Sequence, residues 1–257
     1  MQTSTISPAE PPRPAVRIPL SMTQKTSAKR MLESAREIPQ FSVGIELNAD
    51  KLFAIRTRLN ATIEDKQRKV SLTALLIWLT ARVLQKHPRL NARFDQDAVL
   101  LHDAVNVAVA IDTPAGLTVP VIHKAEMLSV YEIADTLKDL IARATLKRLS
   151  LKDFCDATFT VSNLGMFGVA RFIPLVNPPQ AAILGIGGPR IGMELNADNQ
   201  IAHIRIIELT VTADHRITDG AEVARFLESL RVSLNDLFVS EDLLSRCQKT
   251  ESIGMNP

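Results

Sequence analysis

One histidine near the end of the chain is the residue best placed to do chemistry. His215 follows an alternating apolar segment that ends at Ala213, and an Asp219-Gly220 pair comes four residues later, where a helix is expected to begin. A connection between a strand and a helix is a place where a rigid scaffold can present a base to a cleft. A lone histidine there suits general acid–base work on a substrate that brings its own nucleophile.

On spacing alone, these residues could also be purely structural. Most lone histidines are structural or solvated, and Asp219 could simply cap the helix, with Glu222 as its capping-box partner. His203 lies in the same segment as His215, but no third ligand stands at a recognised spacing, so no metal site is predicted. The sequence also contains no Gly-x-Ser-x-Gly elbow and no glycine-rich phosphate loop.

Composition places the chain among ordinary globular proteins. Of its 257 residues, 46% are apolar and 23% are charged, and the net charge of +2 gives no electrostatic reason to expect nucleic acid or an anionic membrane as partner. No apolar run approaches about 20 residues, so no membrane span is predicted. Cys155 and Cys247 fit no metal spacing, which predicts free thiols in a reducing compartment, and we expect a cytoplasmic protein.

The elements that must position His215 follow from the spacing of apolar residues. Helical spacing predicts helices over residues 23–37, after Asn48, from Ser71 to His87, from Ser129 onward and from Gly220 onward. Alternation predicts strands over residues 41–47, 105–111, 117–122, 158–162 and 201–213, and the apolar run 181–186 predicts a strand buried on both faces. Because strands and helices do not alternate strictly, we expect an α/β or α+β fold with a mixed sheet in a single domain.

An ordered set of motifs makes the sequence similar to a known family. DHRITDGAEVARFL resembles the His-x-x-x-Asp-Gly signature of the catalytic domain of 2-oxoacid dehydrogenase dihydrolipoamide acyltransferases, the E2 components. Further segments resemble E2 blocks in family order, from Arg17 to about Leu244: RIPLSMTQKTSAKRM, IPQF, HPRLNARF, VAVAIDTPAGLTVPVI and TFTVSNLGMFGVARFIPLVNPPQAAILGIG. The resemblance implies a chloramphenicol-acetyltransferase-like mixed sheet flanked by helices. It also implies transfer of an acyl group between coenzyme A and a dihydrolipoyl thiol.

The resemblance also implies catalytic roles for three residues. His215 matches the base that removes the thiol proton, which is needed because a thiol with a pKa of about 8.5 is mostly protonated at neutral pH. Ser162 in TVSNLG matches the serine that donates a hydrogen bond to the tetrahedral oxyanion. Asp219 matches the acidic residue that orders the histidine loop. Without the resemblance, Ser162 would be interpreted only as a serine at a strand end.

Coenzyme A contacts are implied at four further positions: Arg56, Ser71, Asp112 and Asn163. An arginine suits a phosphate, and a serine at a helix start suits an anionic group. The residue types also allow simpler roles, since Arg56 could be a solvated side chain and Ser71 only a helix cap. No metal is expected in the site.

The chain departs from the family in what surrounds the catalytic domain. We expect a proline-rich arm over residues 1–16, the acyltransferase domain over 17–244 and a polar tail over 245–257. The one Asp50-Lys51 pair lies in a predicted helix and not at a hairpin tip, so the lipoyl group is expected in trans, from a separate lipoyl domain or carrier protein. The resemblance further implies a homotrimer or larger core, with His215 of one subunit facing Ser162 of the next. The tail could limit assembly to the trimer.

Two other functions are considered for the same sequence. One is a stand-alone chloramphenicol-acetyltransferase-like enzyme with a small-molecule or carrier-protein acceptor. Such enzymes tend to have His-His-x-x-x-Asp-Gly, whereas Asp214 precedes His215 here. The other is a structural core subunit without catalysis, which would be marked by loss of His215 or Ser162. Both residues are present.

Overall fold

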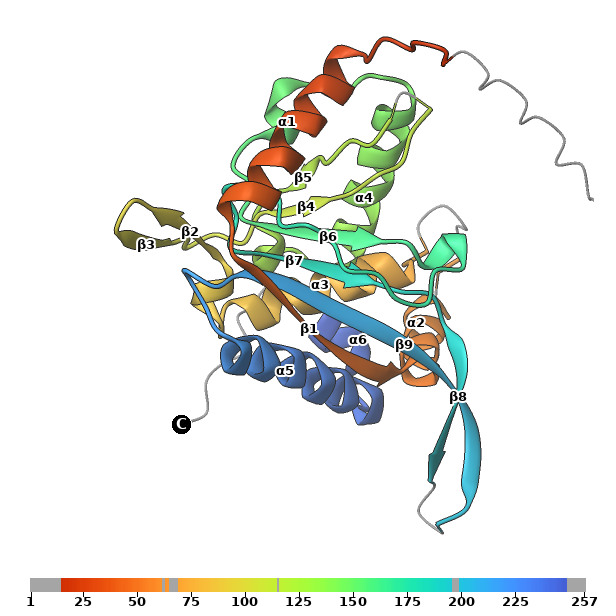
Figure 1. Ribbon diagram of the computed structural model, residues 1–257. Coiled ribbons are helices and arrows are strands. Elements are labelled where there is room, and N and C mark those ends of the chain that lie inside the picture. The colour runs from red at the N-terminus through yellow and green to blue at the C-terminus, as the bar shows by residue number, and fades with distance from the viewer. Residues whose placement is uncertain (1–14, 62, 65–68, 115, 196–198, 249–257) are drawn as a thin grey trace, which may run out of the picture.

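The computed structural model describes residues 15–61, 63–64, 69–114, 116–195 and 199–248. Nearly all of the arm predicted over residues 1–16 and the end of the predicted tail lie outside this part of the chain. Within it, a mixed seven-stranded sheet has the order β1-β9-β7-β6-β4-β5, with β8 paired to β9 (Figure 1). The strands are β1 (Gln40–Asn48), β4 (Val107–Val109), β5 (Val121–Ile122), β6 (Phe159–Asn163), β7 (Ala182–Ile186), β8 (Arg190–Leu195) and β9 (Ile201–Asp214).

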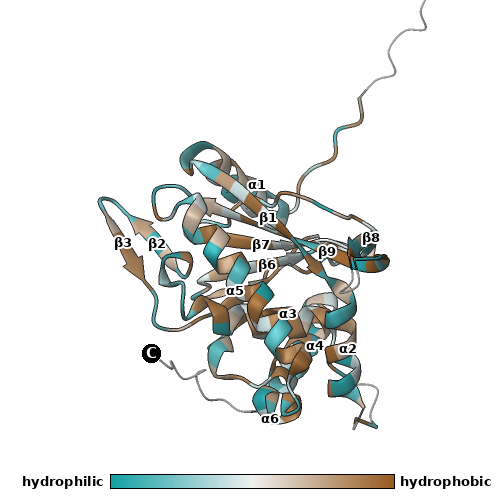
Figure 2. Ribbon diagram, turned by 90° about the horizontal axis from the view of Figure 1, so that it is seen from below, coloured by the Kyte–Doolittle hydropathy of each residue, from teal (hydrophilic) through white to brown (hydrophobic). Residues whose placement is uncertain are grey.

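Helices cover one face of this sheet and leave the other largely to a single helix. The helices are α1 (Met22–Glu37), α2 (Ala49–Asn60), α3 (Leu72–Leu84), α4 (Val130–Thr145), α5 (Gly220–Val239) and α6 (Leu243–Gln248). Figure 2 shows α2 to α6 on one side of the strands and α1 on the opposite side. The sequence signals for helix starts hold, because Ser71 caps α3 and Ser129 closes a capping box with Glu132 at the start of α4. No helix among the described residues is long and apolar enough to cross a membrane.

The two faces of the sheet differ in chemistry, as the alternation of side chains requires. On the face under α2 to α6, apolar residues such as Phe159, Val161 and Leu184 join one continuous core. The intervening residues point to the opposite face, where small polar side chains gather on neighbouring strands: Ser42, Thr160, Ser162, Thr210 and Thr212. The predicted mixed sheet flanked by helices is confirmed. All five residues of β7 are buried, as predicted for this strand.

Two predicted strands are shorter in the structure than in the sequence-based expectation. The segment 105–111 is a strand only at Val107–Val109, and the segment 117–122 only at Val121–Ile122. The hairpin still closes, because Ile111 and Thr118 exchange both backbone hydrogen bonds, at 2.8 and 2.9 Å. Pro120 has no backbone N–H to donate, so the regular hydrogen-bond ladder between the two segments is interrupted at this residue.

Three elements are present that the apolar spacing did not predict. One is a separate hairpin of β2 (Ala92–Asp95) and β3 (Ala98–Leu101), and another is β8, which forms a projecting ribbon with the first part of β9 (Figure 1). The third is α6, which crosses the domain boundary expected at residue 244. Its Leu243 and Cys247 are 1% and 0% exposed and join the main core, so ordered structure continues into the predicted tail.

Candidate active site

His215 lies in the short connection between β9 and α5, as predicted. Its backbone N–H donates to the carbonyl oxygen of Pro39 at 3.0 Å, which ties the connection to the residue just before β1. Its ring centroid is 4.6 Å from that of Phe41, with the two planes at 53°. The side chain is exposed, and neither ring nitrogen has a hydrogen-bond partner among the described residues. The imidazole is therefore fixed in place but open to a substrate.

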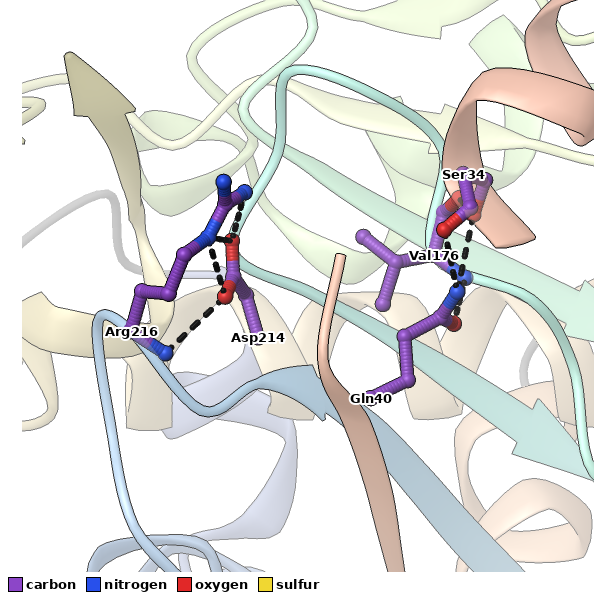
Figure 3. Close-up of polar contacts among 5 residues, drawn as sticks. All are labelled: Ser34, Gln40, Val176, Asp214 and Arg216. Carbon is purple, nitrogen blue, oxygen red and sulfur yellow. Dashed lines mark hydrogen bonds and ion pairs between the residues drawn. The ribbon is translucent and has the colours of Figure 1, made fainter. Parts of the chain in front are cut away.

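The residues on either side of His215 form a tight ion pair that shapes the connection (Figure 3). The Asp214 carboxylate is 1% exposed and accepts from the Nε and Nη2 of Arg216, the latter at 2.7 Å, and from its backbone N–H at 2.9 Å. These bonds raise the pKa of Arg216 above its usual value. The guanidinium also lies 4.4 Å from the ring centroid of Phe94 in β2. A buried carboxylate paired in this way holds the backbone around His215 in one conformation.

Asp219 caps α5, but its expected partner is engaged elsewhere. The Asp219 carboxylate accepts from the backbone N–H of Glu222 at 2.8 Å, so the N-cap prediction is confirmed. The capping-box prediction for Glu222 is wrong: its carboxylate bonds Nδ1 of His87 at 2.9 Å and Arg225 at 2.9 Å. His87 is 7% exposed, and a buried imidazole N–H needs an acceptor.

The charge of Asp219 acts on His215 through space. Hydrogen bonds from the backbone N–H groups at the start of α5 lower the pKa of Asp219, and the nearby Arg225 and His215 lower it further. The carboxylate is therefore ionised at neutral pH.

Ser162 lies near the end of β6, on the polar face of the sheet. Its cross-strand neighbour in β7 is Gly185, against which the side chains of Phe172 and Pro174 pack. Among the described residues the Ser162 hydroxyl has no hydrogen-bond partner, and the residue is only partly buried. A hydroxyl donor in this position is free to bind a negatively charged oxygen.

Within one chain, Ser162 and His215 lie far apart. Ser162 is level with Gly185, and Gly185 is level with Thr210 of β9. His215 follows Thr210 by five residues, which corresponds to roughly 16 Å along the strand at about 3.3 Å per residue. The ring of His215 also contacts Phe41, which packs against the core on the helix-covered side, whereas Ser162 is on the other side. The two predicted catalytic side chains therefore do not meet in a single chain.

Two of the residues predicted to contact coenzyme A, Ser71 and Asn163, lie around the start of α3. Ser71 caps this helix by accepting from the N–H of Ala74 at 3.0 Å. The Asn163 amide donates to Oγ1 of Thr73 at 2.9 Å and accepts from the N–H of Gly165 at 2.8 Å. A helix N-terminus with hydroxyl groups around it favours an anionic ligand. No sequence signal marks Thr73, which is one of several polar residues in an apolar helix.

Arg56 and Asp112 complete this group from neighbouring elements. Arg56 lies one turn before Asn60 in α2, and the Asn60 side chain makes two hydrogen bonds to the backbone of Val70, next to Ser71. The Arg56 guanidinium is 5.2 Å from the ring of Phe53. Within the described residues it forms no ion pair.

Asp112 follows β4 by three residues at the carboxyl ends of the parallel strands. Because Val109 pairs with Val161, Asp112 lies at the same sheet edge as the residues after β6. The carboxyl ends of parallel strands are where ligands bind in open sheets of this kind. The four predicted coenzyme A residues therefore lie at one edge of the sheet, and His215 lies at the opposite edge.

Among the residues that the structure describes, no group of three or more His, Cys, Asp or Glu side chains could hold a metal ion. Cys155 is exposed and Cys247 is buried, and both are free thiols. Burial raises the pKa of the Cys247 thiol to about 11, which keeps it protonated and unreactive at neutral pH.

Comparison with known proteins supplies the family of this fold. Residues 12–239 match the family described as "2-oxoacid dehydrogenases acyltransferase (catalytic domain)". A curated relative is the dihydrolipoyllysine-residue acetyltransferase component of the pyruvate dehydrogenase complex of Rickettsia felis. It is 36% identical over 215 residues, which cover 83% of this chain and 52% of the relative. The chain thus spans about half the length of the curated relatives it matches.

Solved structures agree with this family. The cubic core of a pyruvate dehydrogenase multienzyme complex has a TM-score of 0.82 at 27% identity, covering 89% of this chain and 98% of the other. The dihydrolipoamide acetyltransferase of Azotobacter vinelandii has a TM-score of 0.82 at 28% identity, with the same coverage. Chloramphenicol acetyltransferase, at 16% identity and a TM-score of 0.50, covers 80% of this chain and 94% of its own and shares the fold. This chain belongs to the family of 2-oxoacid dehydrogenase acyltransferase catalytic domains.

Proposed function

We propose that this chain transfers an acyl group between coenzyme A and a dihydrolipoyl thiol, with His215 as the general base. His215 takes the proton of the attacking thiol, and the thiolate sulfur adds to the thioester carbonyl carbon. Ser162 donates a hydrogen bond to the oxyanion of the tetrahedral intermediate. The intermediate then expels the other sulfur as a thiolate, which receives the proton from the His215 imidazolium. One thioester forms as the other breaks, and no metal or redox partner is required.

The observation that carries the proposal is the state of the two side chains in the family fold. Both ring nitrogens of His215 and the hydroxyl of Ser162 lack partners in the described part of the chain. Asp219 carries a negative charge near His215, and its pKa is lowered by the backbone N–H groups at the start of α5 and, to a smaller extent, by Arg225 and His215. Polar groups held in fixed positions without partners can serve a substrate without first breaking protein contacts.

A solved relative supports the same roles by spacing. The Azotobacter vinelandii structure concerns a serine, a histidine and an asparagine in the catalytic mechanism of that enzyme. The histidine and asparagine there are four positions apart, and the serine precedes them by about fifty. His215 and Asp219 have the same spacing here, with Ser162 about fifty positions earlier. The residue four positions after the histidine, an asparagine in that enzyme, is an aspartate in this chain. It adds a negative charge beside the base.

The separation of Ser162 from His215 supports an active site shared between subunits. A site that needs both groups can form only if another copy supplies one of them. We therefore propose a trimer or larger core in which His215 of one subunit faces Ser162 of the next. Coenzyme A would enter from the edge that carries Arg56, Ser71, Asp112 and Asn163. The lipoyl group would come from outside these 257 residues, from a lipoyl domain or carrier protein in the cytoplasm.

The acceptor test separates this function from the alternatives. Purified protein is given acetyl-CoA with free dihydrolipoamide, with a lipoylated domain, or with an alcohol or amine at equal concentration, and release of the coenzyme A thiol is followed. We expect acylation of dihydrolipoamide with a high KM. We also expect a higher kcat/KM with the lipoylated domain, because contacts remote from the thiol contribute to transition-state binding. Acylation of an alcohol or amine alone would indicate a chloramphenicol-acetyltransferase-like enzyme, and no transfer to any acceptor would indicate a structural subunit.

A further inference from the structure

The start of β1 is tied down by an unusually complete set of side-chain hydrogen bonds centred on Gln40 (Figure 3). The Gln40 Nε2 donates to the backbone oxygen of Ser34 at 2.9 Å and to its Oγ at 3.1 Å. The Gln40 Oε1 accepts from the backbone N–H of Val176 at 2.9 Å. The Ser34 hydroxyl in turn donates to the Val176 oxygen at 2.5 Å. Every polar atom of the Gln40 amide is therefore used.

These bonds join three segments that are distant in the sequence. Ser34 belongs to the last turn of α1, Gln40 begins β1, and Val176 lies in the long connection between β6 and β7. Ser34 and Val176 are both 0% exposed, so the hydrogen bond between them is buried, and the three bonds of Gln40 are partly buried. Losing one partner of a buried hydrogen bond leaves the other unsatisfied, which makes such a set hard to rearrange piece by piece.

The segment that Gln40 fixes is the one on which His215 rests. Pro39, the residue before Gln40, accepts the backbone N–H of His215, and Phe41, the residue after it, contacts the imidazole ring. Gln40 itself is level with Asp214, the last residue of β9. The base thus takes its backbone position from one neighbour of Gln40 and its ring contact from the other.

Among the described residues, β9 is the one strand that pairs with this end of β1, which is an edge strand. Next to it, Ile38 is buried against Val176 and Ile183. The Gln40 amide supplies side-chain ties at the point where the ladder ends.

We propose that Gln40 is a positioning residue for His215: its amide fixes the Pro39 carbonyl and the Phe41 ring, and these set where the imidazole lies. This inference rests on the proposed role of His215 as the base. The polar atoms of Gln40 are all engaged with Ser34 and Val176, so we expect its effect to fall on the chemical step. The coenzyme A residues lie at the opposite sheet edge and should bind as before.

The first test replaces Gln40 with leucine, which is similar in size but has no polar atoms. We expect kcat for acyl transfer to fall by about 10- to 100-fold, since small displacements of a catalytic group cost rate on this scale. The KM for acetyl-CoA should stay within about twofold, because its proposed site is untouched. Gln40→Glu keeps the acceptor for Val176 but places a carboxylate oxygen against the backbone oxygen of Ser34, so its kcat should fall at least as far as that of Gln40→Leu.

Two comparisons separate positioning from a general loss of stability. Ser42→Ala removes the 2.8 Å hydrogen bond to Thr212 from the same strand, away from His215, and should leave kcat unchanged. Phe41→Leu removes the ring that the imidazole contacts and should reproduce the kcat loss of Gln40→Leu, whereas Phe41→Tyr should retain activity. If Gln40→Leu fails to fold, Gln40→Glu takes its place in this comparison.

A spectroscopic readout makes the test independent of activity. The His215 ring proton resonances, assigned by their loss in His215→Ala, should show the ring-current shift of Phe41 in the wild type. In Gln40→Leu they should move toward the values of a free histidine. Unchanged resonances and unchanged kcat in a folded Gln40→Leu would overturn the inference. If the wild type transfers no acyl group, the proposed function fails, and the resonances alone decide whether Gln40 positions the ring.

Discussion

The imidazole of His215 and the hydroxyl of Ser162 are held in place by their backbones while their polar atoms stay unoccupied. In His215 this results from the Asp214–Arg216 pair on both sides and the Phe41 ring beneath it. In Ser162 it results from the strand itself and from Gly185 beside it. Both groups are therefore prepared for a ligand without needing to reorganise, which is the condition under which fixed polar groups contribute most to rate.

Replacing His215 tests whether it is the base. His215→Ala should lower kcat by about 10²- to 10⁴-fold, the range for loss of a general base, while circular dichroism stays unchanged. His203→Ala is the matched control, because His203 is also an exposed histidine and lies in the part of β9 that forms the projecting ribbon. A folded His215→Ala with normal turnover of acetyl-CoA and dihydrolipoamide would remove this residue from the mechanism.

Replacing Ser162 tests a different stage of the reaction. Ser162→Ala should lower kcat by about 10²-fold with little change in KM, since an oxyanion donor acts mainly in the transition state. Steady-state kinetics with both thiol substrates give the two constants separately. A rise in KM at constant kcat would instead assign Ser162 to ground-state binding.

At the scale of elements, an ion pair joins α4 to the short 3₁₀ helix Leu151–Phe154 that follows it. Nη1 of Arg143 donates to Asp153 at 2.6 Å, and this bond lowers the pKa of Asp153 to about 2. A carboxyl group with a lowered folded pKa adds stability above its unfolded pKa of about 4, and that stability is lost as the pH falls toward 2.

Asp153→Asn should therefore destabilise the protein by about 1–2 kcal/mol at pH 7, and the difference from the wild type should shrink between pH 4 and pH 2. Urea unfolding at pH 7, 4 and 2.5 measures it. Asp139→Asn removes a more exposed partner of the same arginine and should have a smaller effect. A difference that stayed constant with pH would assign the loss to packing and not to charge.

The helices and the long strands could be predicted from the sequence because their signals are local. Ser71 and Ser129 indicate helix starts because serine is a favourable N-cap residue. The alternation of residues 201–213 indicates a strand without knowledge of the strand it pairs with. The strand β8 has alternating apolar residues, Ile191, Met193 and Leu195. All three side chains are exposed, so the alternation there does not mark a face buried against the core. The extent of strand pairing depends on both partner segments. A single residue, Pro120, is therefore enough to shorten β5.

The candidate site was predictable in its residues but not in its surroundings. His215, Ser162 and Asp219 stand in recognisable motifs. The sequence motifs do not reveal the roles of Gln40 and Phe41, because the alternation around these residues indicates only a strand with one face toward the core. Their contacts with the His215 connection depend on which strand β1 pairs with, and at which register.

At the scale of the whole molecule, the opposed positions of Ser162 and His215 give a test of assembly. Under the proposed assembly, His215→Ala and Ser162→Ala homotrimers should each retain only a small part of the wild-type activity. Mixed trimers formed from equal amounts should regain about a quarter of wild-type activity, because about that share of interfaces would join an intact histidine to an intact serine. The test unfolds and refolds the two variants together, with separately refolded variants combined afterwards as the control. Absence of recovery in mixed trimers would mean that the site lies within one subunit.

The separation of Ser162 and His215 across the sheet has a consequence for a newly synthesised subunit. If the base lies at one edge of the sheet and the oxyanion donor at the other, an unassembled subunit contains only half of each shared active site. Under the proposed function, thioester chemistry would begin only once assembly is finished, so the specific activity would depend on protein concentration. Unassembled copies could still bind acyl-CoA at the edge that carries Arg56 and Ser71, but they would not transfer its acyl group.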